Sequence, residues 1–271
     1  MNSDETVRQP AVAGKFYPGE AELLRHDVLL YLETGGEKQR ALGCVVPHAG
    51  YMYSGHVAGA VYARLALPRR LVILCPNHTG AGEPLAIMSS GAWMTPLGEA
   101  RIDSALAAEL KSAFPYLEED EAAHRAEHSL EVQLPFLQVA LGDFTFVPVC
   151  LGVGQLAVLQ AFGQAIAGVL KDREDVMVIA SSDMNHYESD SITRVKDHKA
   201  IECILALDAT GLHQTVRREG ISMCGYGPTV AMLTATKSLG ATQGELVKYA
   251  TSGDISGDRE MVVGYAGMTI A

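Results

Sequence analysis

Residues 42–56 read LGCVVPHAGYMYSGH, a short apolar run that stops at a Pro-His-Ala-Gly turn. Such a short run ending in Pro and Gly is typical of a fully buried strand, because a helix needs more residues and tolerates both poorly. His48 would follow the carboxyl end of that strand, where the loops of an open α/β sheet form the ligand-binding crevice. This segment therefore predicts a buried strand that carries a histidine into a site.

Short apolar runs and helical patterns continue to alternate along the rest of the chain. Further strands are expected at 70–77, 144–151, 175–181, 245–251 and 261–270, and helices at 20–33, 102–114, 155–171, 191–207, 212–218 and 229–239. This alternation predicts an α/β fold of three layers, with a mostly parallel or mixed central sheet and helices on both of its faces. We expect the final strands to run antiparallel and residues 1–271 to form a single domain.

Four segments carry more specific local signals. Residues 7–20 suit a lid or an edge of the sheet, and Ser54 is a candidate cap for the helix after the first strand. Residues 83–94 read as a strand followed by a turn around residues 93–98. In residues 124–141, His128 is expected near the start of a helix that Pro135 kinks or breaks.

The composition narrows the class of partner. The net charge is −11, with 32 acidic and 21 basic residues and no long basic run, which disfavours nucleic acids and anionic membranes. The 5 cysteines lack paired spacing, so they indicate a reducing compartment rather than a disulfide framework. No signal-peptide pattern occurs and no run approaches the roughly 18 apolar residues of a membrane span, so we expect a soluble cytoplasmic protein. The expected partner is a small molecule, a peptide or a protein, and a homodimer is the default assembly.

Histidines follow three of the predicted strands. A single histidine at a strand end is most often a loop residue bonded to the backbone, but His48, His78 and His186 each come just after an apolar run. If these strands are parallel neighbours, the three side chains converge on one crevice, and such clusters are candidate metal or catalytic sites. Neutral imidazole is a ligand for iron, copper, zinc and nickel.

Cys224 differs from the other cysteines in its surroundings. Four of the five lie inside apolar segments, where cysteine behaves as a small hydrophobic residue: Cys44, Cys75, Cys150 and Cys203. Cys224 lies between flexible residues in ISMCGYGP, so metal ligation and a loop thiol are equally good interpretations.

Two further patterns have competing interpretations. His124, Glu127 and His128 match H-x-x-E-H, the motif of inverted zinc peptidases, although a third ligand is missing and the segment could equally be a loop. Asp254 and Asp258 in TSGDISGD could ligate a cation, but Ser-Gly-Asp runs are usually turns. No dinucleotide fingerprint, phosphate-binding P-loop or serine nucleophile elbow is present in the sequence.

A family resemblance emerges from six motifs taken in order. VRQPAVAGKFYP, VVPHAGYMYSG, CPNHTG, EHSLEVQLPF, SSDMNHY and MCGYGP span nearly the whole chain, and together they resemble the Memo family, also called AmmeMemoRadiSam system protein B. That family is similar in fold to the class III extradiol dioxygenases, which are ring-cleaving non-haem iron enzymes. The resemblance implies an α/β fold of that type with one metal ion in the crevice.

The resemblance also assigns roles residue by residue. His48 and His78 match the two histidine ligands of the family, and Cys224 matches its third ligand. His186 matches the distal histidine that handles substrate protons in the dioxygenases, His128 a further pocket histidine, and Asp183 an acid of the pocket. The ring-cleaving enzymes have a carboxylate where this chain has Cys224, so the implied metal is iron(II) or copper, with zinc as a further choice.

Two functions from different classes follow from this resemblance. The first is a metal-dependent oxidoreductase, similar to a dioxygenase, that acts on a small chelating substrate with His186 as acid and base. The second is a non-enzymatic module that binds a metal or a peptide segment and works through partners, which in microbes are radical-SAM and AMMECR-type proteins. Oxygen consumption with a panel of catechols, set against direct partner binding, would separate the two.

Overall fold

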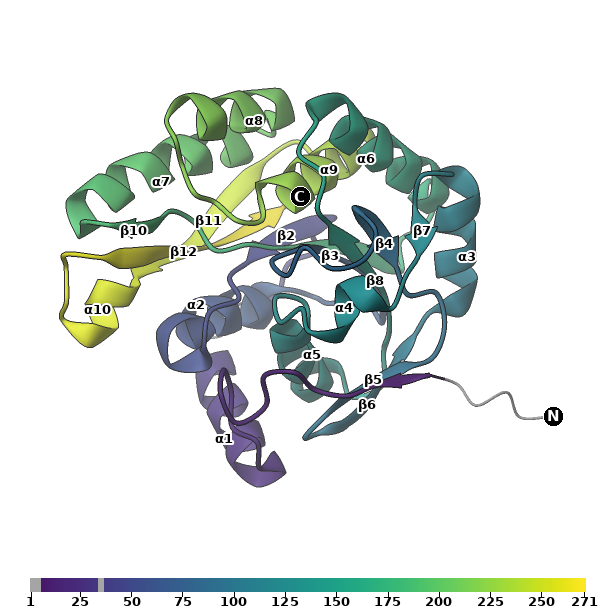
Figure 1. The fold of residues 1–271 in the computed structure, drawn as a ribbon, viewed down its shortest axis with the longest axis horizontal. Helices are drawn as coiled ribbons and strands as arrows, with labels where there is room; N and C mark the ends of the chain where they lie inside the picture. The colour runs from purple at the N-terminus through teal and green to yellow at the C-terminus, as the bar shows by residue number, and fades with distance from the viewer. Residues whose placement is uncertain (1–5, 34–36) are drawn as a thin grey trace.

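The computed structural model describes residues 6–33 and 37–271, and within them it confirms the α/β architecture. A mixed sheet of 12 strands runs through the molecule with helices on both faces (Figure 1). The strands are β1 Val7–Arg8, β2 Gly43–Val46, β3 Arg70–Pro76, β4 Leu85–Ile87, β5 Ala92–Thr95, β6 Gly98–Ile102, β7 Glu118–Glu119, β8 Thr145–Leu151, β9 Val176–Ser181, β10 His186–Glu188, β11 Gly244–Thr251 and β12 Val262–Ile270.

The longer helices fall close to the ranges that the apolar periodicity predicts. The helices are α1 Ala21–Leu32, α2 Tyr51–Arg64, α3 Ser104–Ala113, α4 Ala122–Arg125, α5 Leu134–Leu141, α6 Leu156–Leu170, α7 Asp190–Leu205, α8 Ala209–Arg218, α9 Tyr226–Ser238 and α10 Ser252–Ser256, with a 3-10 helix η1 at Glu131–Gln133. The short helices α4, η1 and α10 were not predicted. Among these described helices, none is long and apolar enough to cross a membrane.

The order of the strands places the site. Along the sheet they run β1-β5-β6-β8-β3-β9-β2-β12-β10, with β11 also on β12 and β4 between β7 and β8. The central strands β8, β3, β9 and β2 are parallel neighbours, whereas β12 pairs antiparallel with β2 and with β11, as predicted for the final strands. The carboxyl ends of β2, β3 and β9 therefore meet at one edge, and the predicted histidines His48, His78 and His186 follow these three strands.

The core has two halves because side chains of a strand alternate between its faces. In β3, Val72 and Leu74 pack in a hydrophobic cluster with residues of α6 and α9. Leu71 and Ile73 point the other way, into a cluster with residues of α1, α2 and α5. Burial of both faces is what a near-continuous apolar strand indicates.

Three local predictions need correction or refinement. Trp93 lies in β5, which forms an antiparallel hairpin with β6, so the predicted turn around residues 93–98 is only its last part. Ser54 lies inside α2, whose N-cap is Gly50, and its hydroxyl donates to the Ala49 carbonyl at 3.0 Å. Pro135 falls in the first turn of α5, where a missing N–H costs nothing, so it neither kinks nor breaks the helix, and η1 leads directly into α5.

The N-terminal segment forms an edge of the sheet. β1 pairs in parallel with β5, through Val7 opposite Ala92 and Arg8 opposite Trp93. The chain from there to the start of α1 crosses in front of α5 and α2 (Figure 1). This agrees with the prediction of a lid or edge.

Candidate metal centre

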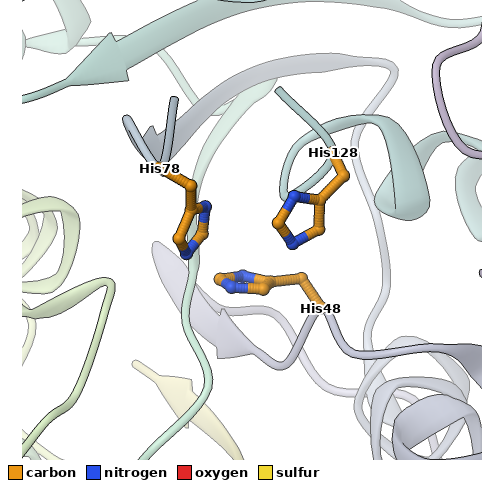
Figure 2. Close-up of side chains that lie close together, drawn as sticks. All are labelled: His48, His78 and His128. Atoms are coloured by element: carbon orange, nitrogen blue, oxygen red, sulfur yellow. The ribbon is translucent and has the colours of Figure 1, made fainter. Parts of the chain in front are cut away.

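Three histidines from different segments converge at the carboxyl edge of the sheet. His48 follows β2, His78 follows β3, and His128 lies between α4 and η1. One nitrogen of each ring lies within 4.8 Å of one nitrogen of both others. The ring centroids are 5.2 Å apart for His48 and His78, and 4.7 Å apart for His78 and His128 (Figure 2).

Hydrogen bonds fix the tautomer of His48. Its Nδ1 lies 2.9 Å from the hydroxyl of Ser181, the last residue of β9. That hydroxyl donates its only proton to the Ser129 carbonyl at 2.6 Å, and it also accepts from the Gln133 amide at 2.9 Å. Nδ1 of His48 must therefore donate, which leaves Nε2 bare for a metal.

A buried carboxylate orients His78 in the same way. Glu127 accepts from the ring Nδ1 of His78 at 2.8 Å and from its backbone N–H at 2.6 Å. Ser129 donates to the same carboxylate with its hydroxyl at 2.7 Å, and Nδ1 of His128 lies 3.5 Å from it. Burial alone would raise the pKa of Glu127, but the His78 hydrogen bond and those from Ser129 outweigh it and lower the pKa to about 2. A carboxylate behind a histidine is a common support of metal ligands, since it fixes the ring and strengthens its basicity.

Two histidines of the cluster, His48 and His128, resist protonation. Burial, reinforced by repulsion from His128, His78 and His186, lowers the pKa of His48 well below its ordinary value. Burial also lowers the pKa of His128. Neutral imidazoles with converging free nitrogens fit a late first-row metal ion.

Cys224 approaches this cluster from the loop before α9. Its Sγ lies 3.2 Å from Nε2 of His48 and 3.7 Å from the Asp183 carbonyl oxygen. Burial, followed by the nearby Asp183 charge, raises the pKa of the thiol, so the metal-free site holds a thiol. A bound metal would reverse this, because a coordinating thiol loses its proton. The sulfur thus stands beside the nitrogen that the tautomer leaves free.

Asp183 supports the site through the backbone. Its carboxylate accepts from the backbone N–H of His48 at 2.7 Å, and the backbone of Ala49 adds a second hydrogen bond. Burial nevertheless raises the pKa of Asp183 to about 7. The structure therefore places the predicted pocket acid on the turn that carries His48.

His186 lies near the same edge but is not one of the three converging histidines, so the predicted trio of His48, His78 and His186 is corrected to one with His128. It begins β10, and its Nδ1 lies 2.9 Å from the Ser222 carbonyl, so Nδ1 donates and Nε2 is left free. Its backbone N–H donates to the Ser222 hydroxyl at 2.7 Å. Its charge is near enough to lower the pKa of His48, and burial lowers the pKa of His186 itself. A neutral imidazole with a free Nε2 is suited to accept a proton.

The H-x-x-E-H motif is divided between two places, which corrects the peptidase hypothesis. His124 lies in α4 and is fully buried against Trp93, with ring centroids 5.6 Å apart. His128 lies beyond the end of that short helix and joins His48 and His78 instead. The two histidines therefore do not share one helix face, as the peptidase site requires.

Asp254, one of the two aspartates considered as cation ligands in TSGDISGD, is bonded to protein groups. Asp254 accepts two hydrogen bonds from Arg194, both at 2.8 Å, and one from the Thr251 backbone at 2.9 Å. The TSGDISGD segment forms the short helix α10, with Asp254 in a capping box. It therefore has a structural role.

Sequence reasoning missed the groups that hold the histidines in place. Ser181, Ser129 and Gln133 are fully buried polar residues that bond to His48 or to its supports. For Ser181 the available signal was the polar sequence directly after an apolar run, in IASSDMNH, whereas Ser129 and Gln133 follow a charged segment and had no such signal. Their partners are distant in the sequence, so the pairings themselves had no signal.

Fold and site together define an α/β protein with a histidine-lined candidate metal centre at the carboxyl edge of its sheet. The profile of the Memo-like protein family matches residues 8–269. MEMO1 family proteins of Methanopyrus kandleri and Methanosarcina barkeri are 47% and 45% identical to this chain, over 96% and 97% of it and 97% and 100% of their own lengths. One from Pyrobaculum aerophilum is 47% identical over 96% of this chain and 97% of its own.

The chain belongs to the Memo-like protein family, as the motifs of its sequence indicated. Among solved structures, an uncharacterized protein of Escherichia coli K12 superposes with a TM-score of 0.57 at 14% identity, over 85% of this chain and 100% of that one. At this identity the likeness concerns the fold alone.

Proposed function

We propose that this protein is a mononuclear non-haem metal protein with oxidoreductase activity of the dioxygenase type toward a small chelating substrate. The observation that carries the proposal is the convergence of His48 and His78, each with Nδ1 held by a hydrogen bond, together with the Cys224 sulfur 3.2 Å from Nε2 of His48. The proposed ligands are His48, His78 and Cys224, with iron(II) or copper as the metal. Zinc fits the same donors.

The remaining residues would act on the substrate and its protons. A metal bound there would supply a Lewis acid and a redox centre. His186 would accept a proton at Nε2, since Ser222 keeps its Nδ1–H engaged. His128, stacked on His78 at 4.7 Å, would line the open side of the site. Asp183 would hold the turn of His48 through its backbone.

Metal analysis tests the binding part of this proposal. Protein purified without chelators or nickel affinity is expected to contain close to one metal ion per chain. Cys224→Ser should lower copper or zinc uptake and leave the melting temperature of the metal-free protein unchanged, whereas Cys224→Asp should favour iron(II). His128→Asn tests the alternative third ligand, because His128 is the third histidine of the cluster, and with Cys224 as the ligand it should lower the affinity much less than Cys224→Ser does. Loss of metal in His128→Asn with retention in Cys224→Ser would reassign the third ligand to His128.

Oxygen consumption tests the catalytic part. The protein is reconstituted anaerobically with iron(II) and then mixed with oxygen and a panel of catechols. Turnover above that of the His186→Ala variant, at equal iron content, is the expected result. Equal rates in the two proteins would contradict a catalytic role for His186.

A second candidate function rests on the thiol. A sulfur beside His48 favours softer ions than the two-histidine, one-carboxylate set of oxygen-activating iron enzymes, so the same crevice suits a metal- or peptide-binding module. Such a module would work through proteins of the radical-SAM or AMMECR type. Calorimetry with those partners, showing tight binding to the metal-free protein with no oxygen consumption, would favour it.

A further inference from the structure

An N-terminal arm, defined here as residues 7–17, is bonded to the loop that carries Glu127 and His128. Arg8 provides most of the attachment. Its Nε donates to the His124 carbonyl at 2.8 Å, and its Nη2 donates to the Glu127 carbonyl at 2.8 Å. Its guanidinium lies over the Trp93 ring, 4.1 Å from the centroid. One side chain thus ties together both ends of the turn that leads into the metal centre.

Arg8 also forms an ion pair with Glu131, the first residue of η1. Its Nη1 donates to Glu131 at 2.6 Å, and both side chains are almost completely buried, with 5% and 0% of their surfaces exposed. Glu131 also accepts from the backbone of Ala11 at 2.7 Å and of Val12 at 3.1 Å, and from the Tyr17 hydroxyl at 2.6 Å. Its carboxylate is therefore saturated by donors that all come from the arm.

The arm also touches the site directly. The Phe16 ring packs on the His128 ring, with centroids 4.8 Å apart. The Phe16 carbonyl accepts from the backbone N–H of Tyr51, which begins the helix after the His48 turn. The arm thus contacts both the loop of His128 and the segment that follows His48.

We propose that the N-terminal arm sets the geometry of the metal centre. Arg8 is a positioning residue for Glu127, and Phe16 is a positioning residue for His128. Arg8 fixes the backbone of the turn by bonds to two carbonyls, and this determines where Glu127 meets His78. Phe16 fixes the plane of the His128 ring. The inference rests on the proposed metal function, but the placement of His128 can be tested without a metal.

The chemistry of Arg8 suggests the decisive substitution. Arginine offers five N–H donors in a planar fork, whereas lysine keeps the charge and offers a point donor. Arg8→Lys therefore preserves the charge opposite Glu131 but cannot reach all four acceptors, which are the carbonyls of Gln9, His124 and Glu127 and the Glu131 carboxylate. Since loss of a buried ion pair can prevent folding, Phe16→Ala serves as the second variant, because it leaves Arg8 and Glu131 intact. Ile166→Ala, in the core of α6 on the other face of the sheet, is a control for lowered stability alone.

The experiment has two readouts. Cobalt(II) affinity and its visible absorption spectrum report the geometry of the loaded site. In the metal-free protein labelled with nitrogen-15 histidine, ring signals of His128, assigned by their loss in His128→Asn, report its environment. Arg8→Lys should weaken cobalt binding by about tenfold, because it loosens Glu127 behind the ligand His78. Both Arg8→Lys and Phe16→Ala should shift the His128 signals. Ile166→Ala should lower the melting temperature with neither effect.

The outcomes separate the inference from the function on which it rests. If the unmodified protein binds no cobalt, the proposed metal function fails, and the His128 signals alone decide the role of the arm. If the unmodified protein binds cobalt while the folded variants keep its affinity and the His128 signals, the inference is wrong. A loss of affinity as large in Ile166→Ala would likewise overturn it, because the effect would then follow stability.

Discussion

Two regions of the site hold their histidines by different means. His48 and His78 leave the ends of β2 and β3, parallel strands on either side of β9, so the backbone ladder of the sheet sets their positions. His128 and His186 stand at the rim. His128 follows Glu127, whose carbonyl Arg8 holds, and His186 begins the short strand β10, where Ser222 bonds to its backbone and its ring. The rigidity of the centre, His48 and His78, therefore follows from the sheet, whereas the rigidity of the rim depends more on its polar hydrogen-bond networks.

This difference indicates that the centre is suited to binding a metal and the rim to contacting a substrate. Residues that bind a metal need fixed geometry, which a buried sheet provides at no extra cost. Residues that meet a substrate can be varied when they sit on irregular segments. The predictions below test this division, beginning with the largest expected effect.

Removing a histidine of the centre should have the largest effect. His48→Ala deletes the Nε2 atom beside Cys224, and we expect metal affinity to fall by about 1000-fold, or about 4 kcal/mol. His128→Asn at the rim should cost only about tenfold. Competition with a chromophoric chelator measures both. Equal losses of metal affinity in the two variants would contradict the distinction between centre and rim.

A buried acid that bonds to the backbone next to His186 should make stability depend on pH. Asp197 accepts from the Asn185 backbone at 2.8 Å and from the Tyr249 hydroxyl at 2.7 Å. Burial raises its pKa from 3.8 to about 6, despite these bonds and the charges of His198 and Arg194. The folded state therefore favours the protonated carboxyl, whose stabilisation is complete below about pH 4 and is lost as the pH rises through 6.

Asp197→Asn should remove this dependence, because the amide is neutral at every pH. Between pH 4 and 7 the unmodified protein should lose on the order of 3 kcal/mol of unfolding free energy relative to the variant. Urea unfolding at four pH values measures the difference. Two parallel curves would mean that Asp197 titrates alike in the folded and unfolded chains.

A glycine next to Cys224 tests the packing of the centre. A Cβ at Gly225 would overlap the Ser181 carbonyl and the Ser182 side chain, so the loop must shift. Gly225→Ala should cost about 2 kcal/mol of stability and move Cys224 away from His48, with weaker copper(I) binding. Thermal unfolding and copper titration are the measurements. Unchanged copper affinity would count against ligation by Cys224.

The smallest effect is expected at the exposed end of the rim. Ser222→Ala removes the hydroxyl that accepts from the His186 backbone at 2.7 Å, while the carbonyl that holds its ring remains. We expect a loss of about 0.5 kcal/mol in chemical unfolding. A loss several times larger would show that the hydroxyl anchors the whole of β10.

The central elements were predictable because each carries its own signal. The apolar runs before His48 and His78 gave β2 and β3 almost to the residue, and the parallel order of the strands brought the two side chains together. Trp93 was placed in a turn because Gly98 and Pro96 dominate the local pattern, whereas cross-strand pairing with Ala100 makes its segment a strand.

The rim was beyond prediction for a physical reason. Arg8 and Glu131 are 123 residues apart, and no periodicity in either segment reports a bond between them. The assignment of His128 to the pocket came from family resemblance, while the spacing of its motif pointed to a helix that includes His124. That helix ends before His128, so local spacing was misleading there. The assignment of Cys224 as a ligand stays a prediction.

The position of β2 between β9 and β12 has a consequence for the making of the protein. On one side β2 pairs with residues 178–181, and on the other with residues 268–270, which a ribosome adds more than two hundred residues after β2 itself. Until β12 arrives, one side of this buried apolar strand is an open edge, and open edges invite pairing between chains. A chain that stops before β12 should therefore aggregate rather than persist as a weakened monomer, and the strand that bears His48 would be its point of association.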